Sequence, residues 1–205
     1  MKIKKIKPDK KNITAVIVAG GKGTRMGGRD KGLIKLSGKP IVEHIIERLS
    51  LQLDLIIVNA NRNLDEYRQL GYPVINDSIT GFQGPLAGIL TALDSSNTEF
   101  IITIPCDAPH LADDFVSKMS NALTESNAEM AVANDGTRMQ QMYALIPASL
   151  SADLTDFLQQ GNRSVKDWFA QQSLIMVDFS TYPKMFININ SREDAIHLEG
   201  TSDAL

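Results

Sequence analysis

The chain has 205 residues, of which 43% are hydrophobic and 22% are charged. This length and composition are typical of one globular domain with its own core, and they exclude a disordered chain, a collagen-like chain and a coiled coil. No run approaches the roughly 20 apolar residues that span a bilayer. The single cysteine, Cys106, excludes an internal disulfide and fits a reducing compartment.

The charge is distributed unevenly along the chain. The net charge is −3, but residues 1–12 contain six lysines and one acid, which leaves 15 basic and 23 acidic residues in 13–205, a net charge of −8. An acidic body argues against nucleic-acid binding, which depends on many phosphate contacts. Residues 1–12 are predicted to form a flexible solvated tail, with contact to RNA or anionic lipid as the alternative. They lack the apolar core of a signal peptide, so we expect a cytoplasmic protein.

From residue 13 onward, short apolar runs alternate with helical patterns. Strands are predicted over 13–18, 55–58, 73–75, 100–104, 129–133, 142–146 and 174–177, with an extended stretch over 186–190. Helices are predicted over 40–49, 64–70, 86–93, 113–123, 149–160 and 164–171, and a capped helix start at 191–194. The alternation predicts a single α/β domain over 13–198 with a mainly parallel sheet, followed by a flexible C-terminus at 199–205.

The glycine-rich segment 19–31 directly follows the first predicted strand. Its five glycines let backbone N–H groups approach an anion, and its four cations suit a polyphosphate. These are Lys22, Arg25, Arg29 and Lys31. The segment does not have the spacing of a P-loop or of a dinucleotide-binding fingerprint, so neither a P-loop NTPase nor a simple NAD(P) enzyme is favoured. A surface loop whose glycines only make turns is the alternative.

Asp107 follows a strongly apolar predicted strand, between Pro105 and Pro109. A carboxylate at a strand end is suited to Mg²⁺, which proteins hold by one or two carboxylates together with substrate phosphates. A turn or helix-capping aspartate is the alternative. The neighbouring Cys106 is predicted to be a buried, inert thiol rather than a nucleophile, because no histidine is placed by a motif to activate it.

Two further polar residues follow predicted strands, as ligand-binding residues of parallel sheets do. Asp77 is suited to assist a metal or to bind a sugar or base, and Asn59 to read a base edge; a turn and a helix cap are the alternatives. The segment 81–88 enters a helix, where it would hold an anion or let a flat ring approach Gly84 and Gly88. Ordinary helix–sheet packing would also account for these glycines.

The motifs together resemble the nucleotidyltransferases that move a nucleoside monophosphate onto a phosphate, and most closely the molybdenum cofactor guanylyltransferases. The resemblance covers about residues 13–195. It is carried by Val18-Ala19-Gly20-Gly21, Arg25-Met26-Gly27, Asp30-Lys31, Gly84-Pro85-Leu86-Ala87-Gly88, Pro105-Cys106-Asp107 with Pro109, and Asn188-Ile189-Asn190. It implies a Rossmann-like three-layer α/β fold and transfer of GMP from GTP to molybdenum-molybdopterin, with Mg²⁺ and release of pyrophosphate.

The resemblance also implies roles for individual residues. Arg25, Lys31 and Asp107 would be catalytic, and Asp107 would hold the metal. GTP would contact Val18, Ala19, Gly20, Lys31, Asn59, Asp77, Gly84, Gly88 and Asp107. Molybdopterin would contact Arg163, Asn188 and Asn190, although Gly161-Asn162-Arg163-Ser164 matches the family only loosely.

Other functions remain open at this point. The nearest is a related nucleotidyltransferase that uses CTP or a sugar phosphate, and another is a non-catalytic carrier of the finished cofactor. Expected partners are GTP and molybdenum-molybdopterin, with transient contact to other cofactor-biosynthesis proteins or recipient enzymes, and neither nucleic acid nor a membrane.

Overall fold

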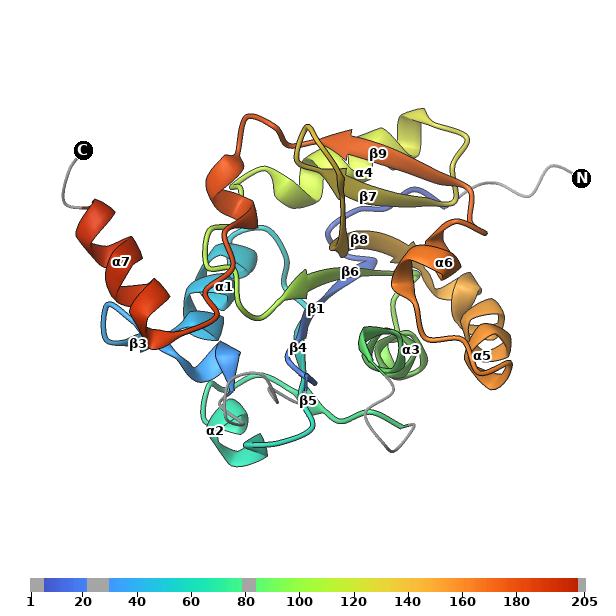
Figure 1. Ribbon diagram of the computed structural model, residues 1–205. Helices are drawn as coiled ribbons and strands as arrows, with labels where there is room; N and C mark the ends of the chain where they lie inside the picture. The colour runs from blue at the N-terminus through green and yellow to red at the C-terminus, as the bar shows by residue number, and fades with distance from the viewer. Residues whose placement is uncertain (1–5, 22–29, 79–83, 203–205) are drawn as a thin grey trace, which may run out of the picture.

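The computed structural model describes residues 6–21, 30–78 and 84–202, which form a three-layer α/β sandwich (Figure 1). The main sheet has seven strands in the order β5-β4-β1-β6-β8-β7-β9. They are β1 (Ile13–Val18), β4 (Ile56–Asn59), β5 (Val74–Ile75), β6 (Phe100–Pro105), β7 (Met130–Asn134), β8 (Met139–Pro147) and β9 (Leu174–Asp178). The expected mainly parallel sheet is confirmed, because only β8 runs against its neighbours.

Helices cover both faces of this sheet. The described part of the chain contains seven α-helices. They are α1 (Ile41–Ser50), α2 (Leu64–Arg68), α3 (Pro85–Ser95), α4 (Phe115–Glu125), α5 (Ser151–Gln159), α6 (Val165–Phe169) and α7 (Arg192–Ser202). Figure 1 places α3, α5 and α6 on one face and α1 and α4 on the other. The helix α7 lies beside the hairpin of β2 (Lys35–Leu36) and β3 (Lys39–Pro40), away from the sheet.

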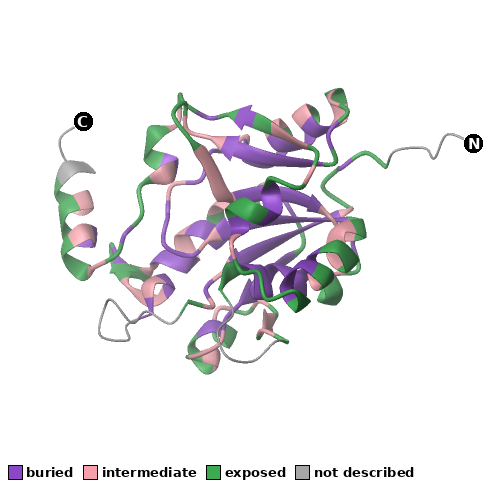
Figure 2. Cartoon of the chain, turned by 45° about the vertical axis from the view of Figure 1, so that its right-hand side comes forward, coloured by how far each residue is buried: buried purple, intermediate pink, exposed green. Residues whose placement is uncertain are grey.

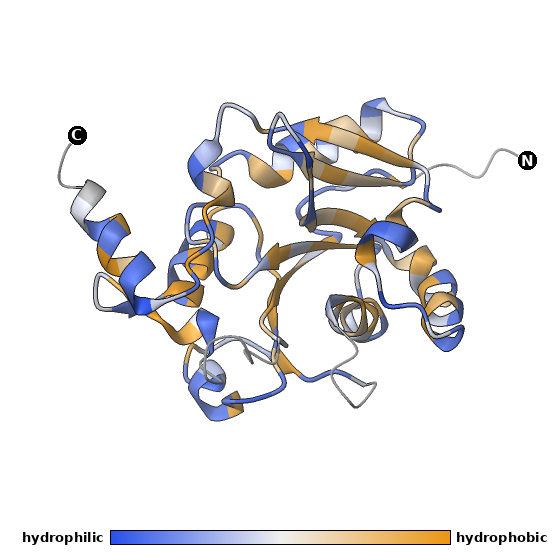
Figure 3. Ribbon diagram, viewed as in Figure 1, coloured by the Kyte–Doolittle hydropathy of each residue, from blue (hydrophilic) through white to orange (hydrophobic). Residues whose placement is uncertain are grey.

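The strand pattern explains why the core has two parts. Successive side chains of a strand point to opposite faces, so a continuous apolar run fills both layers. In β1, Ile13, Ala15 and Ile17 join the cluster beneath α1 and α4, whereas Val16 joins the cluster beneath α3, α5 and α6. Figure 2 shows the central strands buried, and Figure 3 shows the same strands as the most hydrophobic part of the ribbon.

The structure differs from the sequence expectations in three places. A hairpin of β2 (Lys35–Leu36) and β3 (Lys39–Pro40) precedes α1, with Ser37 and Gly38 both at positive φ, as a two-residue type I′ turn requires. The strand β8 has nine residues, because three residues, Met139–Gln141, precede its predicted start at 142 and Pro147 extends its predicted end. A 3₁₀ turn at Pro183–Phe186 replaces the start of the predicted extended stretch 186–190.

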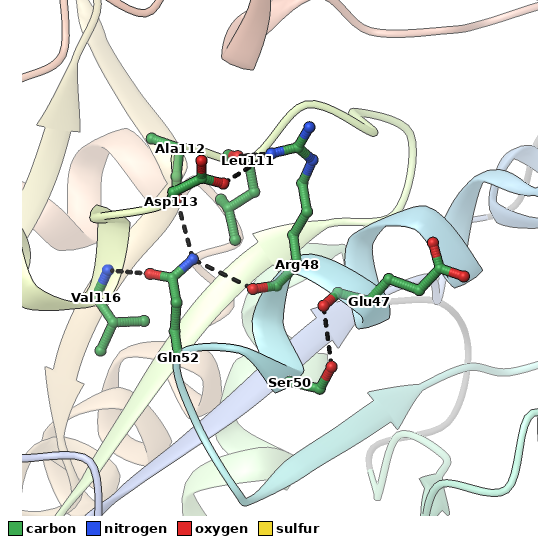
Figure 4. Close-up of polar contacts among 8 residues, drawn as sticks. All are labelled: Glu47, Arg48, Ser50, Gln52, Leu111, Ala112, Asp113 and Val116. Carbon is green, nitrogen blue, oxygen red and sulfur yellow. Dashed lines mark hydrogen bonds and ion pairs between the residues drawn. The ribbon is translucent and has the colours of Figure 1, made fainter.

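A set of polar contacts ties the end of α1 to the chain that follows Asp107 (Figure 4). The Gln52 amide donates to the carbonyl of Ala112 at 3.0 Å and accepts the N–H of Val116 at 2.9 Å. Arg48 donates to the carbonyl of Leu111 at 3.2 Å and pairs with Asp113 at 2.9 Å. These contacts fix the 111–116 segment on α1, and with it the loop that carries Asp107.

Candidate active site

The site lies at the switch point of the sheet, where successive strands are added first on one side of β1 and then on the other. The chain leaves β1 for β4 on one side, and later returns to pair β6 with β1 on the other side. Loops that leave such a pair of strands diverge, which opens a crevice at the carboxyl ends. The residues after β1 and those after β6 therefore meet, and the N–H of Cys106 donates to the carbonyl of Val18 at 3.3 Å.

Three adjoining cavities follow this edge of the sheet. The β4 pocket, of about 250 Å³, is lined by Val18, Gly20, Gly21, Asn59, Asp77, Gly84 and Pro85. The central pocket, of about 160 Å³, is lined by Val18, Ala19, Gly21, Asp30, Lys31, Arg62, Pro105, Cys106 and Asp107. The β8 pocket, of about 650 Å³, is lined by Pro105, Asp107, Arg138, Met139, Gln140, Gln141, Met142, Tyr143, Lys166 and Asn188. Neighbouring pockets share lining residues, so together they form one groove.

A network of amides and one carboxylate forms the wall of the β4 pocket. Asn59 donates to Asp77 Oδ1 at 2.9 Å, and Asn61 donates to Asp77 Oδ2 at 2.8 Å and to the carbonyl of Gly20 at 3.1 Å. Asn61 Oδ1 in turn accepts the N–H of Asp77 at 2.9 Å. Asn61 therefore links the end of β5 to the glycine segment, a role that no sequence motif indicates.

Two glycines make room for this network. A Cβ atom on Gly88 would lie 2.3 Å from Asn59 Oδ1, and one on Gly20 would lie 2.7 Å from Asn61 Nδ2. Gly88 therefore admits the Asn59 amide into the layer between β4 and α3. Asn59 is fully buried, and its Oδ1 has no hydrogen-bond donor among the described residues. An acceptor without a donor at a pocket wall is suited to a ligand that brings N–H groups.

Lys31 and Asp107 meet in the central pocket. Lys31 Nζ pairs with Asp107 Oδ2 at 2.9 Å and donates to Asn190 Oδ1 at 2.6 Å. The N–H of Ile189 donates to the carbonyl of Asp107 at 2.7 Å, which places the Asn188–Asn190 segment against the loop after β6. Residues from three distant parts of the chain thus converge at one cation.

The residue before Lys31 is held rigidly. The buried Asp30 carboxylate accepts the hydroxyl of Tyr67 at 2.6 Å and the amide of Asn63 at 3.1 Å, and it pairs with Arg62 at 3.6 Å. Burial is the main cause that raises the pKa of the Tyr67 hydroxyl, so this group remains a donor at physiological pH. The network fixes the backbone from which Lys31 projects. Arg62 also brings a further cation to the central pocket, which sequence motifs did not indicate.

The structure brings most of the expected site residues together, with two exceptions. Arg25 lies outside the described residues. Arg163 lies beside the β4 pocket, because its carbonyl oxygen is 3.9 Å from the Cβ position of Gly84 and its guanidinium donates to the carbonyl of Leu158 at 2.7 Å. It is Asn188 that lines the β8 pocket.

The described residues do not form the machinery of covalent or zinc catalysis. Cys106 is buried, and burial is the main cause that raises the pKa of its thiol, so it is not a thiolate near neutral pH. In the described ranges, no three His, Cys, Asp or Glu side chains are grouped as a metal cluster would require. The groove instead offers cations, amides and the carboxylates of Asp77 and Asp107, which suit a triphosphate held with a metal ion.

A family profile decides which of the phosphate-binding families is present. The profile of the MobA-like NTP transferase domain matches residues 15–175. The chain belongs to this family. Among curated relatives, a protein from Shewanella halifaxensis named molybdenum cofactor guanylyltransferase is 44% identical over 181 residues, covering 88% of this chain and 90% of the relative. A protein of the same name from Shewanella putrefaciens is 43% identical over 183 residues, covering 89% and 94%.

Solved structures agree on the fold. The molybdopterin-guanine dinucleotide biosynthesis protein A from Archaeoglobus fulgidus has a TM-score of 0.75 at 20% identity, covering 94% of this chain and 100% of that chain. A 4-diphosphocytidyl-2C-methyl-D-erythritol synthase from Anaerococcus prevotii has a TM-score of 0.70 at 16% identity, covering 93% and 96%. Proteins with these two different names share one fold, so the fold alone does not show which nucleotide a protein uses. Among the described residues, no helix has the length and apolar character needed to cross a membrane.

Proposed function

We infer that this protein transfers GMP from GTP to the terminal phosphate of molybdenum-molybdopterin, forming molybdopterin guanine dinucleotide and pyrophosphate. The observation that carries the inference is the family membership, with curated guanylyltransferases 43–44% identical over nearly the whole chain. The groove supports it, because it has room for two substrates on either side of Lys31 and Asp107.

GTP would occupy the β4 and central pockets. The guanine base would lie against Asn59 and Asp77, with Val18, Ala19 and Gly20 along its nucleoside. Guanine presents two N–H donor groups on its pairing edge, whereas cytosine presents one. The acceptors here are the buried Asn59 Oδ1 and the Asp77 carboxylate. A wall rich in acceptors favours guanine, which separates this proposal from the related enzyme that uses CTP.

The chemistry needs no nucleophile from the protein. An oxygen of the acceptor phosphate attacks the α-phosphorus of GTP, one new P–O bond forms, and the bond to the β-phosphate oxygen breaks as pyrophosphate leaves. Because both reactants are polyanions, the task of the protein is positioning and neutralisation of charge. Lys31 would bind the phosphates, and Arg25 would assist from the glycine-rich segment.

The residues present fit a magnesium ion at Asp107. This carboxylate lines both the central and the β8 pockets, and within the described chain only its Oδ2 accepts a hydrogen bond, from Lys31. The other oxygen remains available, and Mg²⁺ is commonly held by one or two carboxylates plus substrate phosphates. When bound there, Mg²⁺ would supply Lewis-acid stabilisation of charge on the phosphates. The chain itself contributes Lys31 and Asp107 as a preformed pair of opposite charges.

The deciding experiment measures pyrophosphate release with each of the four nucleoside triphosphates, in the presence and absence of molybdenum-molybdopterin and Mg²⁺. We expect release with GTP only, dependent on acceptor and metal, together with formation of the guanine dinucleotide. Preference for CTP would replace this proposal with the related cytidylyltransferase. Tight binding of finished cofactor without any release of pyrophosphate would replace it with a carrier.

The acceptor must be delivered and the product must be collected. We place both events in the cytoplasm, through transient contacts with other cofactor-biosynthesis proteins and recipient enzymes. Crosslinking of the protein in cell extract during cofactor synthesis, followed by identification of the linked chains, tests this part separately.

A further inference from the structure

The strand β8 leaves the sheet ladder at the mouth of the groove. Its pairing with β6 extends from Phe100↔Pro147 to Thr103↔Ala144 and stops there. Its register with β7 jumps from Val132↔Ala144 to Ala133↔Gln140. The segment Gln141–Tyr143 therefore has no register partner in either neighbouring strand. We call this segment the β8 bulge. Bulges of this kind redirect side chains and are frequent beside active sites.

The β8 bulge is anchored firmly. Tyr143 is buried, and its hydroxyl donates to the carbonyl of Met185 at 2.7 Å. Its ring makes edge contacts with Phe115 at 6.0 Å and with Phe186 at 5.4 Å, measured between ring centroids. Met185 and Phe186 directly precede the segment with Asn188 and Asn190. The bulge and the asparagines therefore belong to one packed unit, and the geometry of the bulge is a built feature of the site.

The wall that the bulge presents differs in chemistry from the rest of the groove. Arg138, Met139, Gln140, Gln141 and Met142 line the β8 pocket along one side, and Lys166 of α6 lines it as a second cation. Asp135 accepts the side-chain amide of Gln140 at 2.6 Å and lies 3.7 Å from Arg138 Nε, so it holds both. Within the described chain, Lys166 forms no ion pair.

The position of this wall indicates which substrate it faces. Asp107 lines both the central pocket and the β8 pocket, so the reacting phosphates of the two proposed substrates would meet there. A nucleotide in the β4 and central pockets leaves the 650 Å³ of the β8 pocket for the body of the acceptor. Two cations, the Gln141 amide and thioether side chains suit a flat, polar and anionic molecule.

We propose that the β8 bulge, with Arg138 and Lys166, determines which acceptor is used. Arg138 and Lys166 bind negative charge of the acceptor, Gln141 forms hydrogen bonds with the edge of its heterocycle, and Met139 and Met142 pack on the ring. The assignment rests on the proposed function, because it takes molybdenum-molybdopterin as the acceptor. It adds five residues, outside every motif, whose substitution should change the use of the acceptor and leave the KM for GTP unaffected.

The test compares Arg138→Ala, Lys166→Ala and Gln141→Ala with the wild-type protein in two assays. The first measures KM for GTP and for molybdenum-molybdopterin separately. The second measures binding of molybdopterin without GTP, by polarisation of the pterin fluorescence. We expect each charge substitution to raise the acceptor KM and Kd about tenfold, because a charge-assisted contact is lost. Gln141→Ala should raise both about threefold, and the KM for GTP should stay within about twofold.

The chain offers a matched control in Arg68→Ala. Arg68 is exposed and pairs with an aspartate three residues earlier, as Arg138 does, but it lies on α2 and lines none of the three pockets of the groove. This variant should match the wild type in both assays, and Arg138→Lys should recover most of the lost affinity. Thermal melts will establish that all variants are folded.

The two assays separate the two proposals. If molybdopterin binds and the variants weaken that binding, the acceptor assignment stands even when no GMP is transferred, and only the proposed function fails. If the wild type does not bind molybdopterin, or if all three variants bind it within twofold of the wild type, the assignment is wrong. A parallel rise in the KM for GTP would also overturn it.

Discussion

The two halves of the sheet build the groove in different ways. In the parallel half, β5, β4, β1 and β6 all end at the same edge, and polar residues at these ends or shortly after them, such as Asn59 and Asp107, form the site. In the antiparallel half, β8 runs the other way, and its own first residues extend past the end of β6 to form a wall. One half uses the topology of the sheet, and the other uses an irregularity in one strand.

This contrast suggests a division of labour. A parallel edge provides backbone N–H groups and strand-end side chains at fixed positions, which suits the constant part of the reaction, a nucleoside triphosphate. A bulged strand can change length and side chains without disturbing the ladder, which suits the variable part, the acceptor. The predictions below test whether the two halves are this independent.

The largest effect is expected at the junction of the two halves. Asp107→Ala removes the carboxylate that lines both the central and the β8 pockets. We expect the rate of transfer to fall by at least about a hundredfold, because charge stabilisation at the reacting phosphates is lost. Pyrophosphate release measures the rate, and a thermal melt measures folding. Asp54→Ala, at an exposed aspartate that lines none of the three pockets of the groove, is the control. Near-normal turnover in Asp107→Ala would remove the carboxylate from the mechanism.

Lys31→Ala should have the next largest effect. Lys31 touches both Asp107 and Asn190, so its loss removes the cation between the nucleotide side and the acceptor side. We expect kcat/KM for GTP to fall roughly tenfold to a hundredfold, as loss of a charge-assisted contact implies. Lys35→Ala, an exposed lysine of β2, serves as control. Unchanged kinetics would mean that Lys31 only neutralises Asp107.

A steric change should affect the parallel half alone. Alanine normally stabilises a helix interior relative to glycine by about 1 kcal/mol. In Gly88→Ala, however, the new Cβ would lie 2.3 Å from Asn59 Oδ1, and Asn59 is fully buried. Overpacking of this kind costs about 1–3 kcal/mol, so the sign should reverse and the melting temperature should fall.

Displacing Asn59 should also raise the KM for GTP several-fold while the Kd of molybdopterin stays constant. Gly200→Ala is the matched control, because Gly200 lies in α7 with open space around it. A raised Kd for molybdopterin in Gly88→Ala would show that the two halves are coupled.

The sequence predicted the parallel half well, for a physical reason. Buried parallel strands are apolar runs, and the residues after them fall at the ligand edge whatever the rest of the chain does. Asn59, Asp77 and Asp107 were therefore placed by counting from strand ends. Asn61 and Arg62 were not indicated, because their contacts with Asp77 and Asp30 join parts of the chain that no local pattern relates.

The antiparallel half was predicted less completely. Apolar and polar residues do not alternate over Met139–Gln141 as they do in a half-buried strand. The sequence therefore predicts a strand that begins only at Met142. The bulge depends on the register jump against β7 and on Tyr143 reaching Met185, both of which are tertiary features. Arg163 shows the same limit. A loose motif places it on the pterin side, and the fold puts its backbone beside Gly84, a position that no local pattern indicates, so its contact with molybdopterin stays a prediction.

A smaller effect is expected from Tyr143→Phe, which removes only the hydroxyl that anchors the β8 bulge. The buried carbonyl of Met185 would lose its donor, and such a loss costs about 1–3 kcal/mol. We expect a lower melting temperature and an acceptor Kd raised about twofold to fourfold, with the KM for GTP unchanged. Tyr182→Phe, whose hydroxyl donates to Asp114 at 3.1 Å on the half-buried surface, is the control. An unchanged acceptor Kd would show that the bulge holds its shape without this bond.

The smallest effect is expected at Cys106, which lies between Pro105 and Asp107 where the two halves of the sheet meet. Burial raises the pKa of its thiol, so at pH 8 the group stays protonated in the folded protein and ionises only above the pH at which an exposed thiol does. A thiol-reactive disulfide reagent should therefore label the native protein slowly and the denatured protein at once. Fast native labelling would show that the chain after β6 opens readily, and an open junction would no longer hold Asp107 in place for both substrates.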